Sequence, residues 1–87
     1  MSREGKDKMV ENQRLVVEFQ KNSQEMLKVH LQTYKGQEYV DIRAWIKNET
    51  SGEYKATPKG LTINVELLPE LMGALERAGT ALDGGEK

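Results

Sequence analysis

The segment Gln37–Ile46, QEYVDIRAWI, decides the fold because polar and apolar residues alternate along it. An alternation with a period of two residues is typical of a β-strand with one buried face. The apolar set is Val40, Ile42, Ala44 and Ile46, and the opposite set is Tyr39, Asp41, Arg43 and Trp45. The opposite set is too polar for a core, so the sequence predicts a sheet with one face left free for a ligand.

The residues before this segment predict two further strands. From about Gln24 to Tyr34 the apolar side chains again alternate with polar ones, which places Lys28, His30, Gln32 and Tyr34 on one face. Gly36 follows Lys35, and it predicts a tight turn because glycine adopts left-handed backbone angles at little cost. From Arg14, a shorter alternation of Leu15, Val17 and Phe19 with Val16, Glu18 and Gln20 predicts a half-buried first strand. The pair Asn22-Ser23 supplies a turn after it.

After the loop 48–52 a fourth strand is expected from near Glu53. Pro58 cannot donate to a central ladder, so this strand is an edge there or bends. Asn64 fits a helix N-cap, a short turn is expected from Val65 to Leu68, and a helix from Pro69 to about Leu82. Its apolar stripe is Leu68, Leu71, Met72, Leu75, Ala78 and Leu82. The predicted class is α+β: four antiparallel strands in a meander, then one helix that covers one face of the sheet.

Length and composition limit the organisation of the chain. Its 87 residues allow one small domain with a modest core, which self-association would help to stabilise. We expect a disordered tail over 1–12, a domain over 13–82 and a disordered end over 83–87. The chain has no cysteine, no run of about 20 apolar residues and no apolar stretch after its first charges, so a cytoplasmic protein is expected.

The formal net charge of -1 hides an uneven distribution. Basic residues outnumber acidic ones between Met26 and Gly60, whereas acidic residues dominate from Leu61 onward. Two regions of opposite sign indicate two roles, with the basic middle suited to an anionic partner.

Rings and cations on one strand-built surface suit an unpaired nucleic acid, because rings stack on bases while cations follow phosphates. Tyr34 and Trp45 are the candidate stacking residues, and the alternative is that each ring is partial core. The candidate cations are Lys28, Lys35, Arg43, Lys55 and Lys59. Each cation taken alone could be a solvated surface charge, but as a set on adjacent strands they favour phosphate contact.

Catalysis and metal binding find no support in the sequence. His30 is the only histidine, it has no carboxylate at ligand spacing, and we expect it to be an exposed strand residue near the binding face. Asp41 is expected to restrain Arg43 or to cap a turn. The serines have no partner base and the glycines form no phosphate loop, so no enzyme, catalytic residue, metal or cofactor is predicted.

The clusters Tyr34-Lys35-Gly36, Asp41-Ile42-Arg43, 52–55 and 59–62 precede the predicted helix in a specific order. In this order they resemble the single-stranded DNA-binding domain of the transcriptional positive cofactor 4 family, in its compact bacterial form. The resemblance runs from about Phe19 to Leu82. It implies a curved sheet and a nucleoid-associated homodimer that holds single-stranded DNA or melted duplex without strict sequence preference. It also implies that the helix pairs with its twin through Leu68, Leu71, Met72 and Leu75.

The chain departs from the family pattern at several positions. Ile46 stands where the family often has a second aromatic residue, and Gln32, Gln37 and Pro58 stand where it often has basic ones. We therefore expect weaker phosphate binding than in the more basic members.

Three functions remain open from the sequence. The first is binding of single-stranded DNA by a homodimer without strict sequence preference. Its role would be that of a transcriptional coactivator or regulator that contacts the transcription machinery, or a role in replication and repair. The second is a protein-interaction module, and the third is binding of single-stranded RNA.

Overall fold

A computed structural model describes residues 12–84 of the chain. Its elements follow the predicted order of strands and helix. They are β1 (Asn12–Gln20), β2 (Glu25–Tyr34), β3 (Gln37–Lys47), β4 (Tyr54–Asn64), the 3-10 turn η1 (Val65–Leu67) and α2 (Leu68–Leu82). β1 begins at Asn12, a residue that the sequence assigned to the tail. The rest of the predicted tail and residues 85–87 of the predicted C-terminal end lie outside the described residues.

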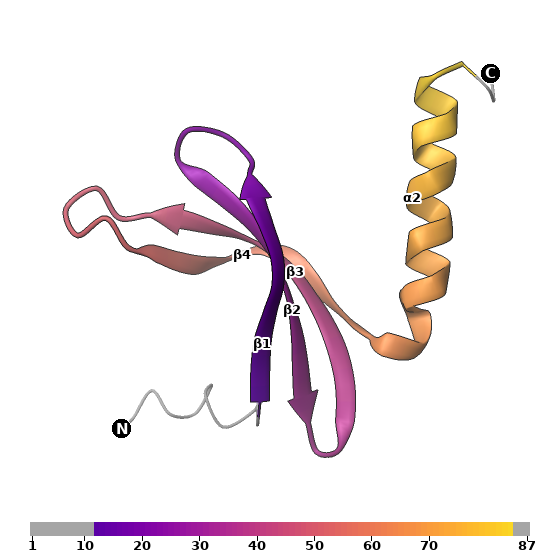
Figure 1. Cartoon of the computed structure of the whole chain (residues 1–87), viewed down its shortest axis with the longest axis horizontal. Coiled ribbons are helices and arrows are strands. Elements are labelled where there is room, and N and C mark those ends of the chain that lie inside the picture. Colours follow the sequence, from indigo (N-terminus) through magenta and orange to yellow (C-terminus); the bar gives the residue numbers. More distant parts are fainter. Residues whose placement is uncertain (1–11, 85–87) are drawn as a thin grey trace.

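The strands form one antiparallel sheet in the order β1-β2-β3-β4, so β1 and β4 are its edges. Figure 1 shows the strong twist of this sheet, with the β2–β3 hairpin and the β3–β4 hairpin extending in different directions. The α+β class and the four-stranded meander predicted from the alternation are confirmed.

Local turn chemistry agrees with the sequence. Lys35 and Gly36 both have left-handed backbone angles, with φ of 52° and 77°, between the paired residues Tyr34 and Gln37. Two consecutive left-handed residues make the hairpin turn whose twist matches the strands. Near the same end of the sheet, where Asn64 pairs with Tyr39, the Asn64 side chain accepts a hydrogen bond from the Glu66 amide at 2.8 Å, as expected for an N-cap.

Two irregularities change the predicted faces. Val16 has no partner between the pairs Leu15–His30 and Val17–Val29, so Leu15 lies on the face of His30 rather than with Val17. A one-residue bulge reverses which side chains face each side, and the simple alternation of β1 was therefore wrong as a guide to its faces.

The second irregularity lies in β4. Its register with β3 shifts between Arg43 and Trp45, beside Pro58, which confirms a bend in an edge strand. Gly60 pairs with Arg43 there, and a Cβ on Gly60 would meet the Ile42 carbonyl oxygen and lie 2.7 Å from the Arg43 Cα. Glycine is therefore required at this close approach of two backbones.

The predicted helix exists, but it does not cover the sheet. Figure 1 shows α2 standing beside the sheet, joined to it through η1, and no residue of α2 is buried. The connection from β4 to α2 is only the three-residue turn η1. Among the described residues the buried hydrophobic side chains are Val40 and Ala44.

Large apolar side chains consequently remain uncovered in the single chain. Those exposed on β1 and α2 are Leu15, Val16, Val17, Phe19, Met72, Leu75 and Leu82. The apolar face of the sheet pairs Val29 with Ile42 and Leu27 with Ala44, and β1 extends that face without burying any residue of its own. Across residues 12–84, no helix combines the length and apolarity needed to span a bilayer.

Candidate nucleic-acid interface

The pairing register defines one side of the sheet, which we call the polar face. Cross-strand partners lie on the same side, and the pairs Lys28–Arg43, His30–Asp41, Gln32–Tyr39 and Met26–Trp45 link β2 to β3. The polar face comprises Met26, Lys28, His30, Gln32, Tyr34, Tyr39, Asp41, Arg43 and Trp45, with Gln13, Leu15, Glu18 and Gln20 on β1 and Tyr54, Ala56, Gly60, Thr62 and Asn64 on β4. The face expected to be free for a ligand therefore forms as the alternation predicted.

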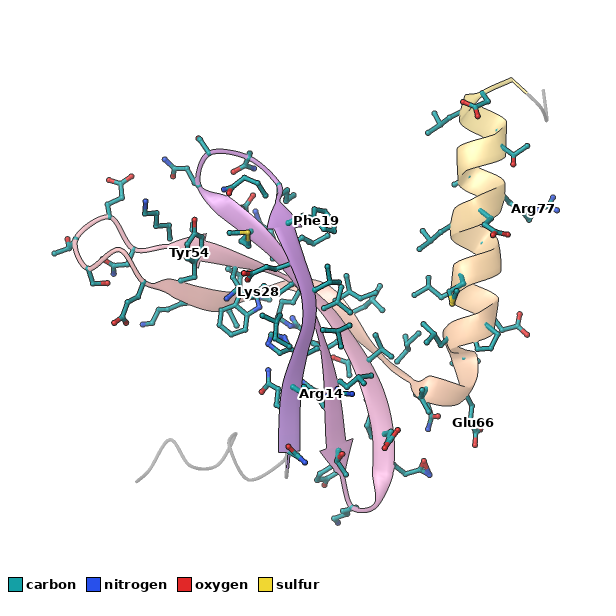
Figure 2. All side chains as sticks on the ribbon, viewed as in Figure 1. Arg14, Phe19, Lys28, Tyr54, Glu66 and Arg77 are labelled. Carbon is teal, nitrogen blue, oxygen red and sulfur yellow. The ribbon has the colours of Figure 1, made fainter. Side chains whose placement is uncertain are left out.

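Trp45 lies at the centre of a group of rings and one cation. The Lys28 ammonium is 4.5 Å from the centroid of the Trp45 ring and 5.8 Å from that of Tyr54. The imidazole of His30 is 5.6 Å from the Trp45 ring, with the planes tilted by 37°. Figure 2 labels Lys28 and Tyr54, which come from different hairpins. An ammonium this close to an indole is attracted by the ring, so Lys28 and Trp45 form a single unit.

His30 differs from its expected exposure. Its side chain is buried, with 7% of the residue exposed, and burial lowers the pKa of the imidazole while nearby Asp41 opposes that shift. His30 Nδ1 and Trp45 Nε1 are buried without a hydrogen-bond partner. The rings of Trp45 on β3 and His30 on β2 lie 5.6 Å apart, a contact that strand periodicity does not predict.

Arg43 is tied to its own sheet. Its Nη2 lies 2.8 Å from Asp41 Oδ1, and its Nε lies 3.2 Å from each Asp41 carboxylate oxygen. Nη1 donates to the Thr57 carbonyl at 3.0 Å and Nη2 donates to Thr62 Oγ1 at 3.2 Å, so the guanidinium bridges β3 to the bent part of β4. These contacts confirm that Asp41 restrains Arg43, and the hydrogen bond to Asp41 raises the pKa of Arg43. They leave Arg43 less available to phosphate than a free cation.

Lys28 also has a partner, because its ammonium lies 3.5 Å from Glu18 Oε1 on the edge strand β1. Glu18 and Lys28 are directly opposite each other in the register. The polar face thus holds two opposite-charge pairs, Lys28 with Glu18 and Arg43 with Asp41, side by side across three strands.

Two of the predicted cations lie on the opposite side of the sheet. Lys55 pairs with Ile46, which belongs to the apolar face. The Lys59 ammonium lies 3.0 Å from Glu25 Oε2, and Glu25 is also a partner of Ile46. Lys55 and Lys59 are each next to a β4 residue that pairs with the polar face, Ala56 and Gly60, so strand alternation places both lysines on the side of the sheet away from Trp45.

Tyr34 and Lys35 are at the far end of the β2–β3 hairpin. The Lys35 ammonium is 5.5 Å from the Tyr34 ring, and Tyr34 shares the polar face with Trp45. The tip of the hairpin thus has an ammonium beside an aromatic ring, as Lys28 and Trp45 do. Of the predicted residues, Lys28, Tyr34, Arg43 and Trp45 therefore share the polar face, and Lys35 lies beside Tyr34 in the turn at its end.

Sequence reasoning missed Tyr54 and Glu18 as members of this surface. Tyr54 pairs with Lys47 across the β3–β4 hairpin, and Glu18 pairs with Lys28. The clustered sequence 52–55 marked Tyr54 as unusual but did not show which face it takes. Only the register supplies that answer, because each hairpin sets its own alignment of strands.

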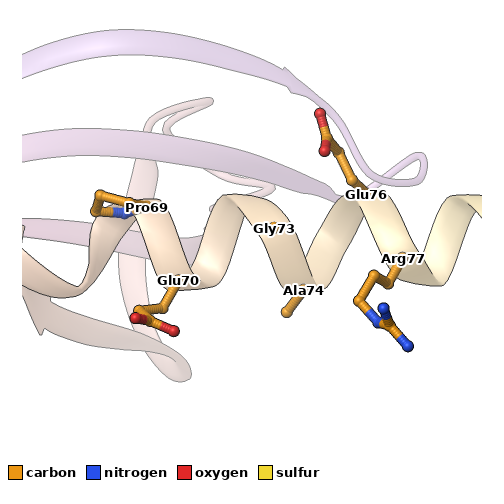
Figure 3. Close-up of a pocket in the computed structure, with 6 residues that line it drawn as sticks. All are labelled: Pro69, Glu70, Gly73, Ala74, Glu76 and Arg77. Atoms are coloured by element: carbon orange, nitrogen blue, oxygen red, sulfur yellow. The ribbon is translucent and has the colours of Figure 1, made fainter.

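The remaining chemistry of the described part of the chain is sparse. Within residues 12–84 no three His, Cys, Asp or Glu side chains gather closely enough to hold a metal ion. A shallow hollow follows α2, and Figure 3 shows Glu70, Ala74 and Arg77 projecting from one side of the helix while Glu76 points to the other. The predicted interface residues Leu68, Leu71, Met72 and Leu75 belong to the apolar stripe, and none of them is buried in the single chain.

Comparison with known proteins agrees with this geometry. The family model of transcriptional coactivator p15 (PC4) matches residues 21–74, which begin just before β2 and end within α2. The chain belongs to the PC4 family. That family binds nucleic acid and is not enzymatic. The matched residues include Lys28, His30, Trp45 and Tyr54, as the sequence resemblance did. They do not include β1, and therefore do not include Glu18.

The fold is also similar to a solved bacterial protein. The crystal structure of a PC4 homologue from Burkholderia pseudomallei in a tetragonal form is 25% identical, with a TM-score of 0.71, and the alignment covers 78% of this chain and 98% of that one. An orthorhombic form of the same homologue gives a TM-score of 0.71 at 25% identity, with 79% and 92% covered. No curated protein matches the chain.

Proposed function

We propose that the chain binds single-stranded DNA on its polar face, as a homodimer and without strict sequence preference. The observation that carries the proposal is the half-buried group formed by the rings of Trp45 and Tyr54 and the ammonium of Lys28 on a sheet face of a PC4-family chain. A ring on a sheet face can stack on a base only when that base is unpaired. The surface therefore favours single strands or melted duplex over intact duplex.

In this proposal Trp45 and Tyr34 stack on bases, and Lys35 and Lys28 lie beside them to meet phosphates. Arg43 acts mainly by holding the bent part of β4 in place, since its donors already bind Asp41, Thr57 and Thr62. Lys55 and Lys59 reach a strand only where that strand passes over the edge formed by β4. Their contribution is correspondingly smaller than the sequence alone suggested.

The homodimer is proposed from uncovered apolar surface. The stripe of α2 and the apolar face of the sheet are large relative to the small core of a single chain. Burial of apolar surface is the main force of association, at about 25 cal/mol per Å². Pairing of Leu68, Leu71, Met72 and Leu75 with the same residues of a second chain would bury the stripe.

We place this activity where cells hold unpaired strands: as a transcriptional coactivator or regulator that meets the transcription machinery, or in replication and repair. The chemistry also suits single-stranded RNA, because every base presents a stacking face. The uncovered apolar side chains of β1 and α2 would serve a protein-interaction module equally well if they were not used for dimerisation.

The test is a fluorescence anisotropy titration with a labelled twenty-base DNA oligonucleotide at low salt. We expect a dissociation constant of roughly micromolar or lower, with weaker binding to the matched duplex. Competition with an RNA oligonucleotide of the same sequence ranks the two nucleic acids. No binding at low salt would refute the proposal, and capture of polypeptides that survives nuclease treatment would favour the protein-interaction module.

A further inference from the structure

Lys28 is held between a carboxylate and two rings. Its ammonium lies 3.5 Å from Glu18 Oε1, 4.5 Å from the Trp45 ring centroid and 5.8 Å from that of Tyr54. The Lys28 side chain is 19% exposed and that of Glu18 is 41% exposed. The cation is thus largely enclosed, whereas the carboxylate that holds it faces solvent at the sheet edge.

This arrangement affects both the ring that would stack on a base and the cation that would meet a phosphate. A base that stacks on Trp45 needs space over the ring, and part of that space is taken by the Lys28 ammonium. A phosphate that approaches Lys28 meets a cation already paired with Glu18. Nucleic acid must therefore compete with a carboxylate of the protein for the central lysine of the polar face.

Building on the proposed function, we propose that Glu18 limits the affinity of the strand-binding surface for a single strand. Its carboxylate holds Lys28 against Trp45 and competes with the phosphates of a single strand for the same ammonium. A strand binds at this position only when its phosphate replaces Glu18, so Glu18 lowers affinity and reduces the electrostatic share of binding.

This competition changes how strongly the binding affinity depends on salt concentration. A phosphate that pairs with a free lysine releases a counterion, which adds about 0.7 to the slope of log affinity against log salt for a single strand. When Lys28 leaves Glu18, however, the exposed carboxylate takes up a cation from solution, and the two exchanges cancel. In the wild-type chain Lys28 therefore adds little to the salt dependence.

Glu18 lies on β1, where every residue is exposed, and in its pair with Lys28 the Glu18 side chain is the solvent-facing partner, 41% exposed. Surface pairs contribute little to folding, so replacing Glu18 by glutamine leaves the fold intact. The rings of Trp45 and Tyr54 still receive the stem of Lys28 after this change. Binding and stability are thus separable at this residue.

The test compares four chains with the same twenty-base oligonucleotide over a salt series: wild type, Glu18→Gln, Lys28→Gln and the double variant. We expect Glu18→Gln to bind roughly two- to fivefold more tightly at low salt. Its salt slope should steepen by about 0.7. Lys28→Gln alone should leave the salt slope at the wild-type value. The double variant should show neither the tighter binding nor the steeper slope of Glu18→Gln. The emission of Trp45, the single tryptophan of the chain, reports whether strand binding displaces Lys28 from its ring.

The matched control is Glu70→Gln, which removes the same charge from α2, away from the polar face. It should leave the salt slope unchanged. A gain in affinity equal to that of Glu18→Gln would mean that the change in net charge alone is responsible. Wild-type binding with an unchanged slope in Glu18→Gln overturns the competition but not the proposed function. If Lys28→Gln has a salt slope about 0.7 shallower than that of wild type, this result also overturns only the competition. Absence of binding by the wild type overturns both.

Discussion

The guanidinium of Arg43 is bound to the carboxylate of Asp41 on the same strand, with Nη2 2.8 Å from Oδ1. Asp41 is 3% exposed, and it also accepts a hydrogen bond from Thr62 Oγ1 at 2.6 Å. The residue that looks most like a phosphate ligand in the sequence is therefore a brace between β3 and β4. Its partner is a buried carboxylate that has no other cation within ion-pair distance among the described residues.

Replacing Arg43 by glutamine should destabilise the fold. The change leaves the Asp41 carboxylate buried without a counter-charge, which costs about 3 kcal/mol of unfolding free energy. Urea denaturation followed by circular dichroism measures the loss. Lys47→Gln, an exposed position on the same strand, serves as the control and should stay within about 0.5 kcal/mol of wild type. Normal stability combined with lost DNA binding would instead make Arg43 a direct phosphate ligand.

Trp45→Ala should weaken DNA binding at high salt as well as at low salt. Loss of one stacking partner costs about 1 to 3 kcal/mol, and stacking is not screened by ions as a charge contact is. Trp45→Phe keeps a ring and should retain most of the affinity. Anisotropy titrations at two salt concentrations measure both variants, and a loss confined to low salt would contradict the stacking role.

Gly60→Ala should destabilise the sheet by about 1 to 3 kcal/mol, because the added Cβ meets the backbone of Ile42 and Arg43. Gly73→Ala is the matched control, since nothing lies within 4 Å of the Cβ position in this helical residue. The control should raise stability by about 0.5 to 1 kcal/mol. Thermal unfolding of the two variants separates the effects, and equal shifts for both would refute the close approach at Gly60.

Stability should fall in acid because of Glu25. Its carboxylate accepts hydrogen bonds from Asn22, Lys59 and Lys21, which lower its pKa from 4.5 to about 2. A carboxyl whose pKa is lower in the folded chain stabilises the fold above pH 4.5 and loses that effect as the pH falls toward 2. Unfolding curves across this range should show a steeper decline for wild type than for Glu25→Gln. Parallel curves would contradict the assignment.

Leu75→Asp should shift the chain from dimer to monomer. In the single chain Leu75 is 59% exposed, so most of its surface is available to a second copy, and a fall in mass reports on that contact. Sedimentation equilibrium gives the mass of the variant. Thr80→Asp, on the opposite side of α2 by helical periodicity, is the control and should keep the wild-type mass. A dimeric Leu75→Asp would place the interface elsewhere.

Much of the fold was predictable because its signals are local. The alternation in Gln37–Ile46, the turn at Lys35-Gly36 and the Asn64 cap each depend on residues that are neighbours in the chain. The alternation also placed Trp45 and Tyr34 on the polar face correctly. It failed at Leu15, because a bulge changes the face without leaving a clear mark in the pattern.

The sequence by itself determined the strands, the turns and the ring-bearing face, because a period of two residues is a property of the backbone. Only the tertiary structure decided the partner of each charged side chain: Glu18 pairs with Lys28, Lys59 pairs with Glu25, and Arg43 donates to the Thr57 carbonyl. These contacts join residues that are distant in the chain, and each depends on a strand register that two bulges shift. Likewise, the path of α2 depends on the geometry of η1, so the exposure of its apolar stripe could not be derived from the stripe alone.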